Sequence, residues 1–439
     1  MNAKPTAEAA PPPGEVSVLV EHLFRHEAGK MVAILTRIFG LDHLSLAEDV
    51  VQESLSRALQ TWPFYGVPAN PSAWLMRTAR NLALDVVRRE KVFREKEAEL
   101  VHLMDRPSLS PEASIFTEHE IADDRLRMMF VCCHPVIPAE AQLALALNTL
   151  CGFSVLEISR AFLTSEAAIA KRLTRAKAKI RDARVPFEIP TGAELAGRLE
   201  IVLEALYLLF NEGYKASAGD KLVREDICQE AIRLAALLAQ HPIGNRPKTH
   251  ALLTLMLLNS ARNPARVDDQ GNLLRLQEQD RSRWDQATLA RGMAHFAISA
   301  AGEELTRYHL EAGISACHCA ATDFASTDWP RILALYDRLT AFDNSPIIAL
   351  NRAVAVANVH GPAAGVAAVD AIHNRAQLDS YYLLYAVLGD LEAQQGNLRA
   401  AAGYFRQALE LTQLESEQRF LHKRIEACRE PKHEAAAAA

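Results

Sequence analysis

The chain has 439 residues, 49% of them hydrophobic, which is enough for two to four domains with cores of their own. Its net charge of -6 excludes a uniformly basic coat for nucleic acid, so any DNA contact has to come from local patches. Seven cysteines without paired spacing favour a reducing compartment. Because the sequence has neither an apolar run of about 18 residues nor an apolar signal core, we expect a cytoplasmic protein without a membrane span.

Helical periodicity predominates along the chain, and no convincing run alternates apolar with polar residues, so the predicted fold class is all-α. Composition predicts disordered ends at 1–15, which is rich in Ala and Pro, and at 429–439, which is an Ala tail. Between the ends we expect a helical unit at 16–90, a charged and Pro/Ser-bearing linker at 91–118, a second helical unit at 119–185 and a larger helical body at 190–428.

A helix predicted from Leu46 to Trp62 has an acidic and amide-bearing face. Its polar positions, spaced i, i+3, i+4 and i+7, are Asp49, Gln52, Glu53 and Ser56. The opposite, apolar side is expected to hold Val50, Val51, Leu55 and Leu59. The polar face is either a solvated surface or a docking surface for a basic partner helix.

The next segment combines aromatic and basic residues. Prolines and a glycine predict a loop from Pro63 to Pro71 that carries Phe64 and Tyr65, after which Trp74 opens a helix. Beside the buried stripe of that helix, a second surface holds Arg77, Arg80, Asn81, Arg88 and Arg89. Rings stack on unpaired bases, guanidinium groups hold phosphates and an amide can read a base edge, so the pattern is typical of single-stranded DNA binding. The alternative is that the rings are core residues and the arginines are solvated.

The segment from Phe153 to Arg181 predicts a helix-turn-helix. The buried stripe of its second helix consists of Ile169, Leu173, Ala176 and Ile180. The basic residues around that stripe are Lys171, Arg172, Arg175, Lys177, Lys179 and Arg181. Thr164-Ser165 supplies a capping hydroxyl, and a shorter helix from Ser154 to Phe162 packs beneath. This is the layout of a recognition helix that enters the major groove.

The back half contains one good helical-hairpin repeat, from Tyr382 to Leu414, with its turn at Gly396-Asn397. The residues that match the 34-residue pattern are Tyr385, Leu388, Gly389, Ala401, Phe405 and Ala408. A weaker copy runs from Ile347 to Ile372. A body built from such repeats offers a groove for a protein partner, and the alternative is a scaffold without an external ligand.

Two cysteine-histidine clusters, at 132–134 and 317–319, have the residue types of metal ligands. Adjacent helical residues point about 100° apart, so three in a row seldom converge on one ion, and no second pair at zinc-finger spacing completes either set. The usual nucleotide-binding and hydrolase motifs are also missing. We therefore expect no metal, no cofactor and no catalytic residue, and we interpret the chain as a non-enzyme.

The order of these motifs resembles a known family. AEDVVQESLSRALQTWP (47–63) and AWLMRTARNLALDVVRRE (73–90) are similar to conserved region two of bacterial sigma-70 factors, and the segment at 153–181 is similar to region four. The short linker and the lack of room for regions one and three resemble the extracytoplasmic-function (ECF) class. Four later segments, DDRLRMMFVCCHP, YLLFNEGY, QDRSRW and ALNRAVAVA, resemble the subgroup with a C-terminal extension related to tetratricopeptide repeats (TPR).

The resemblance implies partners and roles for matching residues. Asp49, Gln52 and Glu53 are expected to dock on the β′ clamp helices of core RNA polymerase. The β flap of the polymerase is expected to be a second contact of the chain. The promoter -10 element is melted and read by Phe64, Tyr65, Trp74, Arg77, Arg80, Asn81 and Arg88. The -35 element faces Glu166, Ala167, Ala168, Ala170, Lys171, Arg172, Thr174 and Arg175. One departure is Leu163, which stands in the turn where sigma factors commonly have Gly.

The linker length agrees with this interpretation. The two promoter elements lie roughly 16 to 18 base pairs apart, which at about 3.4 Å per pair is about 55 to 60 Å. Residues 91–118 reach at most about 90 Å when fully extended. The linker can therefore span the promoter.

The leading hypothesis is a sigma factor that binds core polymerase, recognises the -35 and -10 elements, and helps to melt the promoter. In that hypothesis the C-terminal domain regulates in cis and can bind a regulatory protein. The alternative is a helix-turn-helix regulator that acts on duplex DNA without polymerase and uses the back half as a TPR-like sensor. A third class is a repeat-built adaptor or enzyme.

Overall fold

The computed structural model describes residues 13–90, 123–162, 164–183, 193–215, 223–270, 272–412 and 414–429. Within these ranges the chain is helical, with no strand beyond one isolated antiparallel bridge between Val267 and Leu273, so the predicted all-α class is confirmed. The chain divides into two compact units, one made of 1–209 with 241–243 and one made of 210–240 with 244–439. The finer division into sequence-defined domains stays a prediction.

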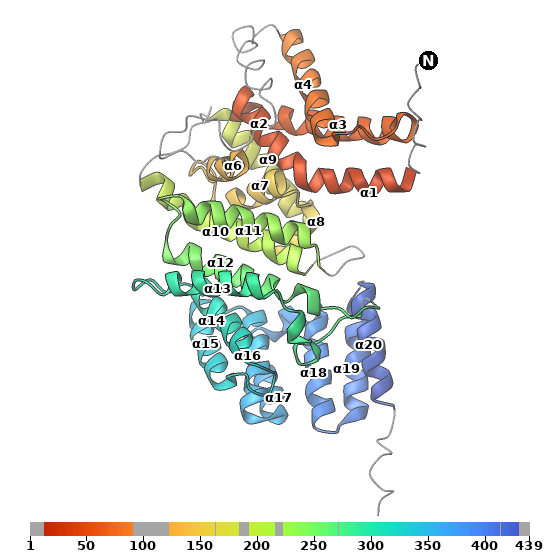
Figure 1. The fold of residues 1–439 in the computed structure, drawn as a ribbon, viewed down its shortest axis with the longest axis vertical. Coiled ribbons are helices and arrows are strands. Elements are labelled where there is room, and N and C mark those ends of the chain that lie inside the picture. The colour runs from red at the N-terminus through yellow and green to blue at the C-terminus, as the bar shows by residue number, and fades with distance from the viewer. Residues whose placement is uncertain are drawn as a thin grey trace, which may run out of the picture. The chain divides into compact units, whose positions relative to one another are not determined.

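The first unit contains α1 (Pro13–Leu23), α2 (Gly29–Phe39), α3 (Leu44–Tyr65), α4 (Pro71–Glu90), α6 (Asp124–Cys132), α7 (Ala139–Cys151), α8 (Val155–Ala161), α9 (Glu166–Asp182) and most of α10 (Ala193–Tyr214) (Figure 1). A π-helix (Phe24–Ala28) and a 3-10 helix (Leu41–His43) flank α2. Helix α1 begins three residues before the predicted start at 16, because a proline suits the first turn of a helix. The predicted linker lies outside the described residues, as do residues 1–12 and 430–439 of the predicted disordered ends.

Helix α2 is the centre of this unit, because eight of its residues are buried and it packs against α3, α6 and α7. Its first residue, Gly29, lies so close to α7 that a Cβ there would stand 2.1 Å from the carbonyl oxygen of Leu150. Arg37, near the other end of α2, donates to Asp124 of α6 at 2.7 Å. One buried helix therefore holds α3, from the first predicted helical unit, together with α6 and α7, from the second.

The second unit consists of the end of α10 with α11 (Glu225–Gln240), α12 (Pro247–Ser260), α13 (Gln286–Ser299), α14 (Arg307–Ala320), α15 (Trp329–Phe342), α16 (Pro346–His360), α17 (Pro362–Asp370), α18 (Tyr382–Gln394), α19 (Leu398–Leu411) and α20 (Glu415–Ala427). In the described part of this unit, four 3-10 helices lie between them, at Asn263–Ala265, Leu276–Glu278, Arg281–Arg283 and Arg375–Leu378. Successive helices pack on one another, and α18, α19 and α20 lie side by side (Figure 1).

The strongest predicted repeat corresponds to the α18–α19 hairpin. Gly396 makes the turn with a φ of 83°, a value that L-residues with a side chain rarely adopt. Phe405 is fully buried and fills the space beside Gly389, where a Cβ would lie 2.7 Å from the ring. The weaker copy corresponds to α16 and α17, which turn at Gly361 with a φ of 92°.

Candidate nucleic-acid and partner interfaces

The acidic face of α3 is open to solvent. Asp49, Gln52 and Glu53 are all exposed, whereas Val50, Val51 and Leu55 are buried as predicted. Glu53 pairs with Arg57 one turn along the helix at 2.9 Å, and both side chains are about half exposed. An exposed pair of this kind contributes about 0.3 to 0.5 kcal/mol, so a competing basic partner can replace Arg57. The face is therefore available to a cationic surface.

One expectation on the apolar side of α3 is wrong. Leu59 is 44% exposed, and the buried stripe runs through Leu55, Ala58 and Trp62 instead. A 3.6-residue period carries the stripe from 55 to 58 and 62, so Leu59 is rotated about 100° past Ala58 towards solvent. The exposed Leu59 extends the acidic face with an apolar patch.

The predicted loop at Pro63 begins later than expected. Helix α3 continues through Pro63 to Tyr65 and ends at Gly66, which has a φ of 82° and donates its N–H to the Trp62 carbonyl at 2.9 Å. Pro63 has no N–H to donate to the Leu59 carbonyl four residues earlier, yet the helix continues for two residues beyond it. Phe64 and Tyr65 therefore sit on a helix end, 80% and 88% exposed. Two large rings held this far in solvent form a surface to which an unpaired base can stack.

Helix α4 begins three residues earlier than expected, at Pro71 instead of Trp74. Asn70 caps it, accepting a hydrogen bond from the backbone N–H of Ala73 at 3.0 Å, and proline is well suited to the first helical position. The Asn-Pro pair was the sequence signal for this boundary.

Trp74 is neither a fully buried core residue nor a fully exposed one. Its ring meets the buried Trp62 edge to face at 5.4 Å between centroids, so Trp74 fixes α4 against α3 and keeps only part of its ring accessible. Within the next two turns of α4, Arg77 and Asn81 are exposed and Arg80 is half-buried. Arg88 lies in α4, but its side chain lies outside the described residues.

Helices α8 and α9 have the layout predicted for the basic segment. The buried stripe of α9 is as expected, and Ser165 caps the helix by accepting from the N–H of Ala168 at 3.3 Å. Helix α8 has its own cap, because Ser154 and Glu157 accept each other's backbone N–H at 3.1 and 2.7 Å. This S-x-x-E box was readable in the sequence. Leu163, in the turn, lies outside the described residues.

The eight residues expected to face the -35 groove do not share one environment. Those exposed on α9 are Glu166, Ala167, Ala170, Lys171, Thr174 and Arg175, and Ala168 is half-buried. Arg172 is also half-buried, because its guanidinium pairs with Glu140 of α7 at 2.9 Å and lies over the ring of Phe162. Lys171 and Arg175 are thus the open cations on this part of the helix, and Arg172 is anchored to its own unit.

The sequence groups Lys177 with the basic residues of α9, but in the structure its side chain is mostly buried in an ion pair. Its ammonium donates to Glu48 of α3 at 2.5 Å, and the other carboxylate oxygen of Glu48 accepts from Thr149 of α7 at 2.7 Å. The Lys177 and Glu48 side chains are 24% and 16% exposed. Sequence reasoning missed Glu48, because its partners lie 101 and 129 residues away.

The two cysteines at 132 and 133 are buried in a helical core, whereas residues 317–319 are only half-buried. Burial raises the pKa of the Cys133 thiol to about 12 and that of Cys319 to about 11, whereas it lowers the pKa of His318 to about 4. Among the described residues, no group of three or more His, Cys, Asp or Glu side chains is arranged to hold a metal ion. Within that same part of the chain, no helix is both long and apolar enough to cross a membrane.

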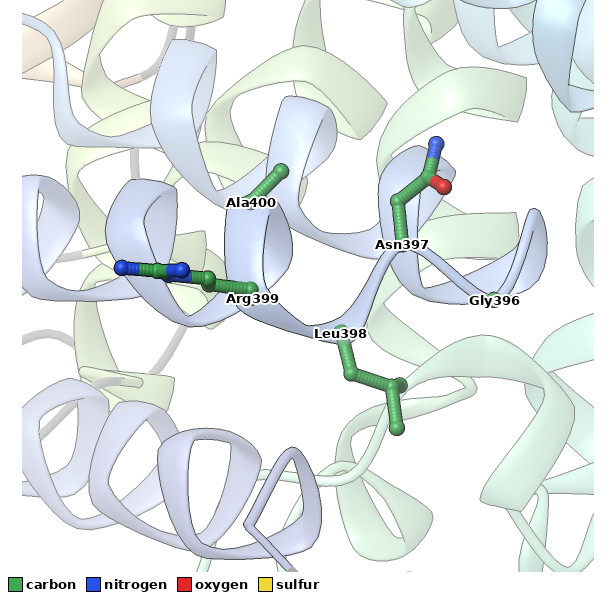
Figure 2. Close-up of a pocket in the computed structure, with 5 residues that line it drawn as sticks. All are labelled: Gly396, Asn397, Leu398, Arg399 and Ala400. Atoms are coloured by element: carbon green, nitrogen blue, oxygen red, sulfur yellow. The ribbon is translucent and has the colours of Figure 1, made fainter.

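A shallow depression opens at the turn between α18 and α19, lined by residues 396–400. Figure 2 shows the side chains of Asn397, Leu398 and Arg399 pointing in different directions. Because no polar groups converge there, the depression has no arrangement suited to catalysis.

Comparison with known proteins gives three findings. Residues 23–92, from the end of α1 to just beyond α4, match the sigma-70 region 2 family. Residues 198–300 match a family of unknown function, DUF6596. An uncharacterized protein of Rhizobium meliloti (strain 1021) is 38% identical over 386 residues, which cover 88% of this chain and 90% of that protein. No solved structure matches the chain.

Proposed function

Because the chain belongs to one family with the uncharacterized Rhizobium meliloti protein and contains a sigma-70 region 2, we propose that it is an ECF-class sigma factor that acts in the cytoplasm. In this proposal it binds core RNA polymerase, recognises the -35 and -10 promoter elements and helps to melt the promoter. The region 2 match supports a sigma-70 family factor, and that family binds core polymerase and promoter DNA.

The observation that carries the proposal is the pairing of two unlike surfaces on α3. Asp49 and Glu53 form an exposed acidic face near its start, and Phe64 and Tyr65 are exposed at its end, about 17 to 24 Å further along the axis. A basic helix of polymerase fits the first surface, and an unpaired base fits the second. A regulator of duplex DNA alone has no use for this combination.

Helix α9 supplies the second promoter contact in the proposal. Its exposed Lys171 and Arg175 can neutralise phosphates, while Glu166, Ala167 and Ala170 at its first turns can face base edges in the major groove. The cap at Ser165 fixes where α9 begins, and the buried stripe packs α9 against α7 and α8. Together they fix the direction in which these exposed residues point.

Run-off transcription with purified core polymerase tests the proposal. We expect a promoter-dependent transcript, and we expect Asp49→Lys with Glu53→Lys to reduce co-purification with core at least about tenfold, since two favourable charge pairs become repulsive. Asp337→Lys, which reverses one exposed acidic charge in the second unit, is the control for charge reversal away from α3. If the protein binds DNA but gives no promoter-dependent transcript, it is a helix-turn-helix regulator that acts without polymerase, and the proposal is wrong.

The second unit acts, in this proposal, as a TPR-like regulator in cis. Its support is the hairpin sequence of α16 to α19. Arg198 of α10 donates to the Phe130 carbonyl of α6 at 3.1 Å, so a truncation should keep α10 and end after Tyr214. If that truncated protein transcribes and responds to its signal as the full chain does, the second unit has no regulatory role.

A further inference from the structure

Four histidines lie on three helices of the second unit that pack on one another, α12, α13 and α14 (Figure 1). They are His250, His295, His309 and His318. His250 is 5% exposed, and the other three are half-buried. Burial is the largest of the causes that lower the pKa of each ring. The segment is therefore built around histidines that are uncharged at neutral pH.

His250 and His295 join α12 to α13. The Nε2 of His250 donates to the side-chain oxygen of Asn245 at 3.0 Å, which leaves its Nδ1 as the acceptor of a neutral ring. That Nδ1 lies 2.9 Å from the Nδ1 of His295, which donates to it. A proton taken up by the Nδ1 of His250 would leave two N–H groups facing each other and break the contact. Burial, the neighbouring ring and Arg291 of α13 all lower the pKa of His295.

His309 serves as a hydrogen-bond acceptor at the start of α14. Its Nδ1 accepts the backbone N–H of Thr306 at 3.1 Å and completes the capping box of the helix. A protonated ring has two N–H groups and no acceptor, so protonation removes this cap. Burial lowers the pKa of the ring most, and Lys248 of α12 adds to this effect. The backbone of Ser299 and the carboxylate of Glu304 raise the pKa by less.

His318 lies near the other end of α14, among positive charges. Its pKa is lowered to about 4, first by burial and then by the guanidinium groups of Arg262 and Arg281. Arg281 donates to the His318 carbonyl at 2.6 Å, which keeps that charge in place. The Nδ1 of His318 is buried without a hydrogen-bond partner among the described residues, and its ring meets Trp329 of α15 at 5.3 Å between centroids. A charge on this ring is therefore opposed by burial and by two neighbouring cations.

We propose that α12, α13 and α14 form an acid-responsive segment of the second unit, which stays packed while the four histidines are neutral and loosens when they bind protons. The inference concerns this unit alone and stands whether or not the chain is a sigma factor. It names a signal, a fall in pH, that the unit can sense through side chains at both ends of α14.

The direction of the response follows from the linkage between proton binding and stability. A ring with a lower pKa in the packed segment than in the loosened one binds a proton on loosening. Its contribution to stability is complete above the ordinary pKa of 6.5 and is lost as the pH falls towards the lowered value. For His318, with a pKa of about 4, the ratio of packed to loosened molecules should fall about tenfold between about pH 7.5 and about pH 5.5. The other three rings add to this fall.

Hydrogen exchange of the full-length protein, followed by mass spectrometry, tests the response. Protection factors are compared at about pH 7.5 and about pH 5.5, each corrected for the intrinsic exchange rate at that pH. Peptides from α12, α13 and α14 should lose protection at least about tenfold. Peptides from α18 and α19, whose residues 382–394 and 398–411 include no histidine, should lose at most about twofold.

Two variants and a control assign the response to the four histidines. His318→Gln removes a proton site and should make the acid-induced loss of protection in α14 about tenfold smaller. His295→Gln, at a half-buried position, keeps a hydrogen-bonding side chain beside His250 and should reduce the loss in α12 and α13. His373→Gln, at an exposed position of the same unit, should leave the loss unchanged.

Three results would overturn the proposal. The first is equal protection of α12, α13 and α14 at the two pH values. The second is an equal loss in α18 and α19, which would mean that acid acts on the whole unit. The third is a loss that neither His318→Gln nor His295→Gln reduces, because the protons would then bind elsewhere. If His318→Gln does not fold at neutral pH, the result for His295→Gln decides alone.

Discussion

Removing two exposed cations from the first half of α9 should weaken DNA binding and reduce the dependence of that binding on salt. Lys171 and Arg175 are exposed, whereas Arg172 is paired with Glu140. Each phosphate contact contributes about 0.9 to the slope of log affinity against log salt, so Lys171→Ala with Arg175→Ala should lower the slope by about 1.8. Between about 50 and 200 mM salt, the unaltered protein should therefore lose about twelvefold more affinity than the variant.

Fluorescence anisotropy with a labelled duplex carrying the mapped -35 element measures this slope. The control is Arg406→Ala with Lys423→Ala, which removes the same charge from exposed positions in the second unit and should leave the slope within about 0.3 of the unaltered value. If the α9 variant keeps the slope of the unaltered protein, its groove-facing side has been assigned wrongly.

Three further predictions concern separate parts of the chain. Phe64→Ala with Tyr65→Ala should abolish permanganate-reactive open complexes with little change in melting temperature, since both rings are in solvent; a large loss of stability would contradict this. Gly389→Ala should destabilise the second unit by about 1 to 3 kcal/mol in thermal melts, because a Cβ meets the Phe405 ring, whereas Gly403→Ala, with no atom within 4 Å, should not. With its pKa at about 12, the Cys133 thiol should resist iodoacetamide at about pH 8 until denaturant is added, as mass spectrometry can show.

Periodicity predicted much of the local structure. The stripe through Ile169, Leu173, Ala176 and Ile180 is buried as expected, since a regular repeat of large apolar residues leaves a helix few ways to pack. The same reasoning failed at Leu59, where alanine at 58 occupies the buried position. Because alanine is only weakly hydrophobic, the pattern pointed to Leu59 instead of Ala58 as the buried residue.

Boundaries and long-range contacts were harder to predict. Pro63 indicated a loop, yet α3 continues through it, and Gly66 is the residue that ends the helix. The contact between Glu48 and Lys177 spans 129 residues and depends on how α2 packs against α7. Helical patterning along one segment contains no information about such a partner, so the sequence placed Lys177 with the solvent-facing cations.

Helix α3 is one uninterrupted run of 22 residues that begins before the acidic face and ends with the exposed rings. Inserting one residue between Glu53 and Phe64 would move the rings about 1.5 Å and turn them about 100° around the axis. Substitutions in this stretch leave that distance and angle intact, whereas insertions and deletions change both at once. We therefore expect relatives to vary in sequence between the two surfaces while keeping the number of residues fixed.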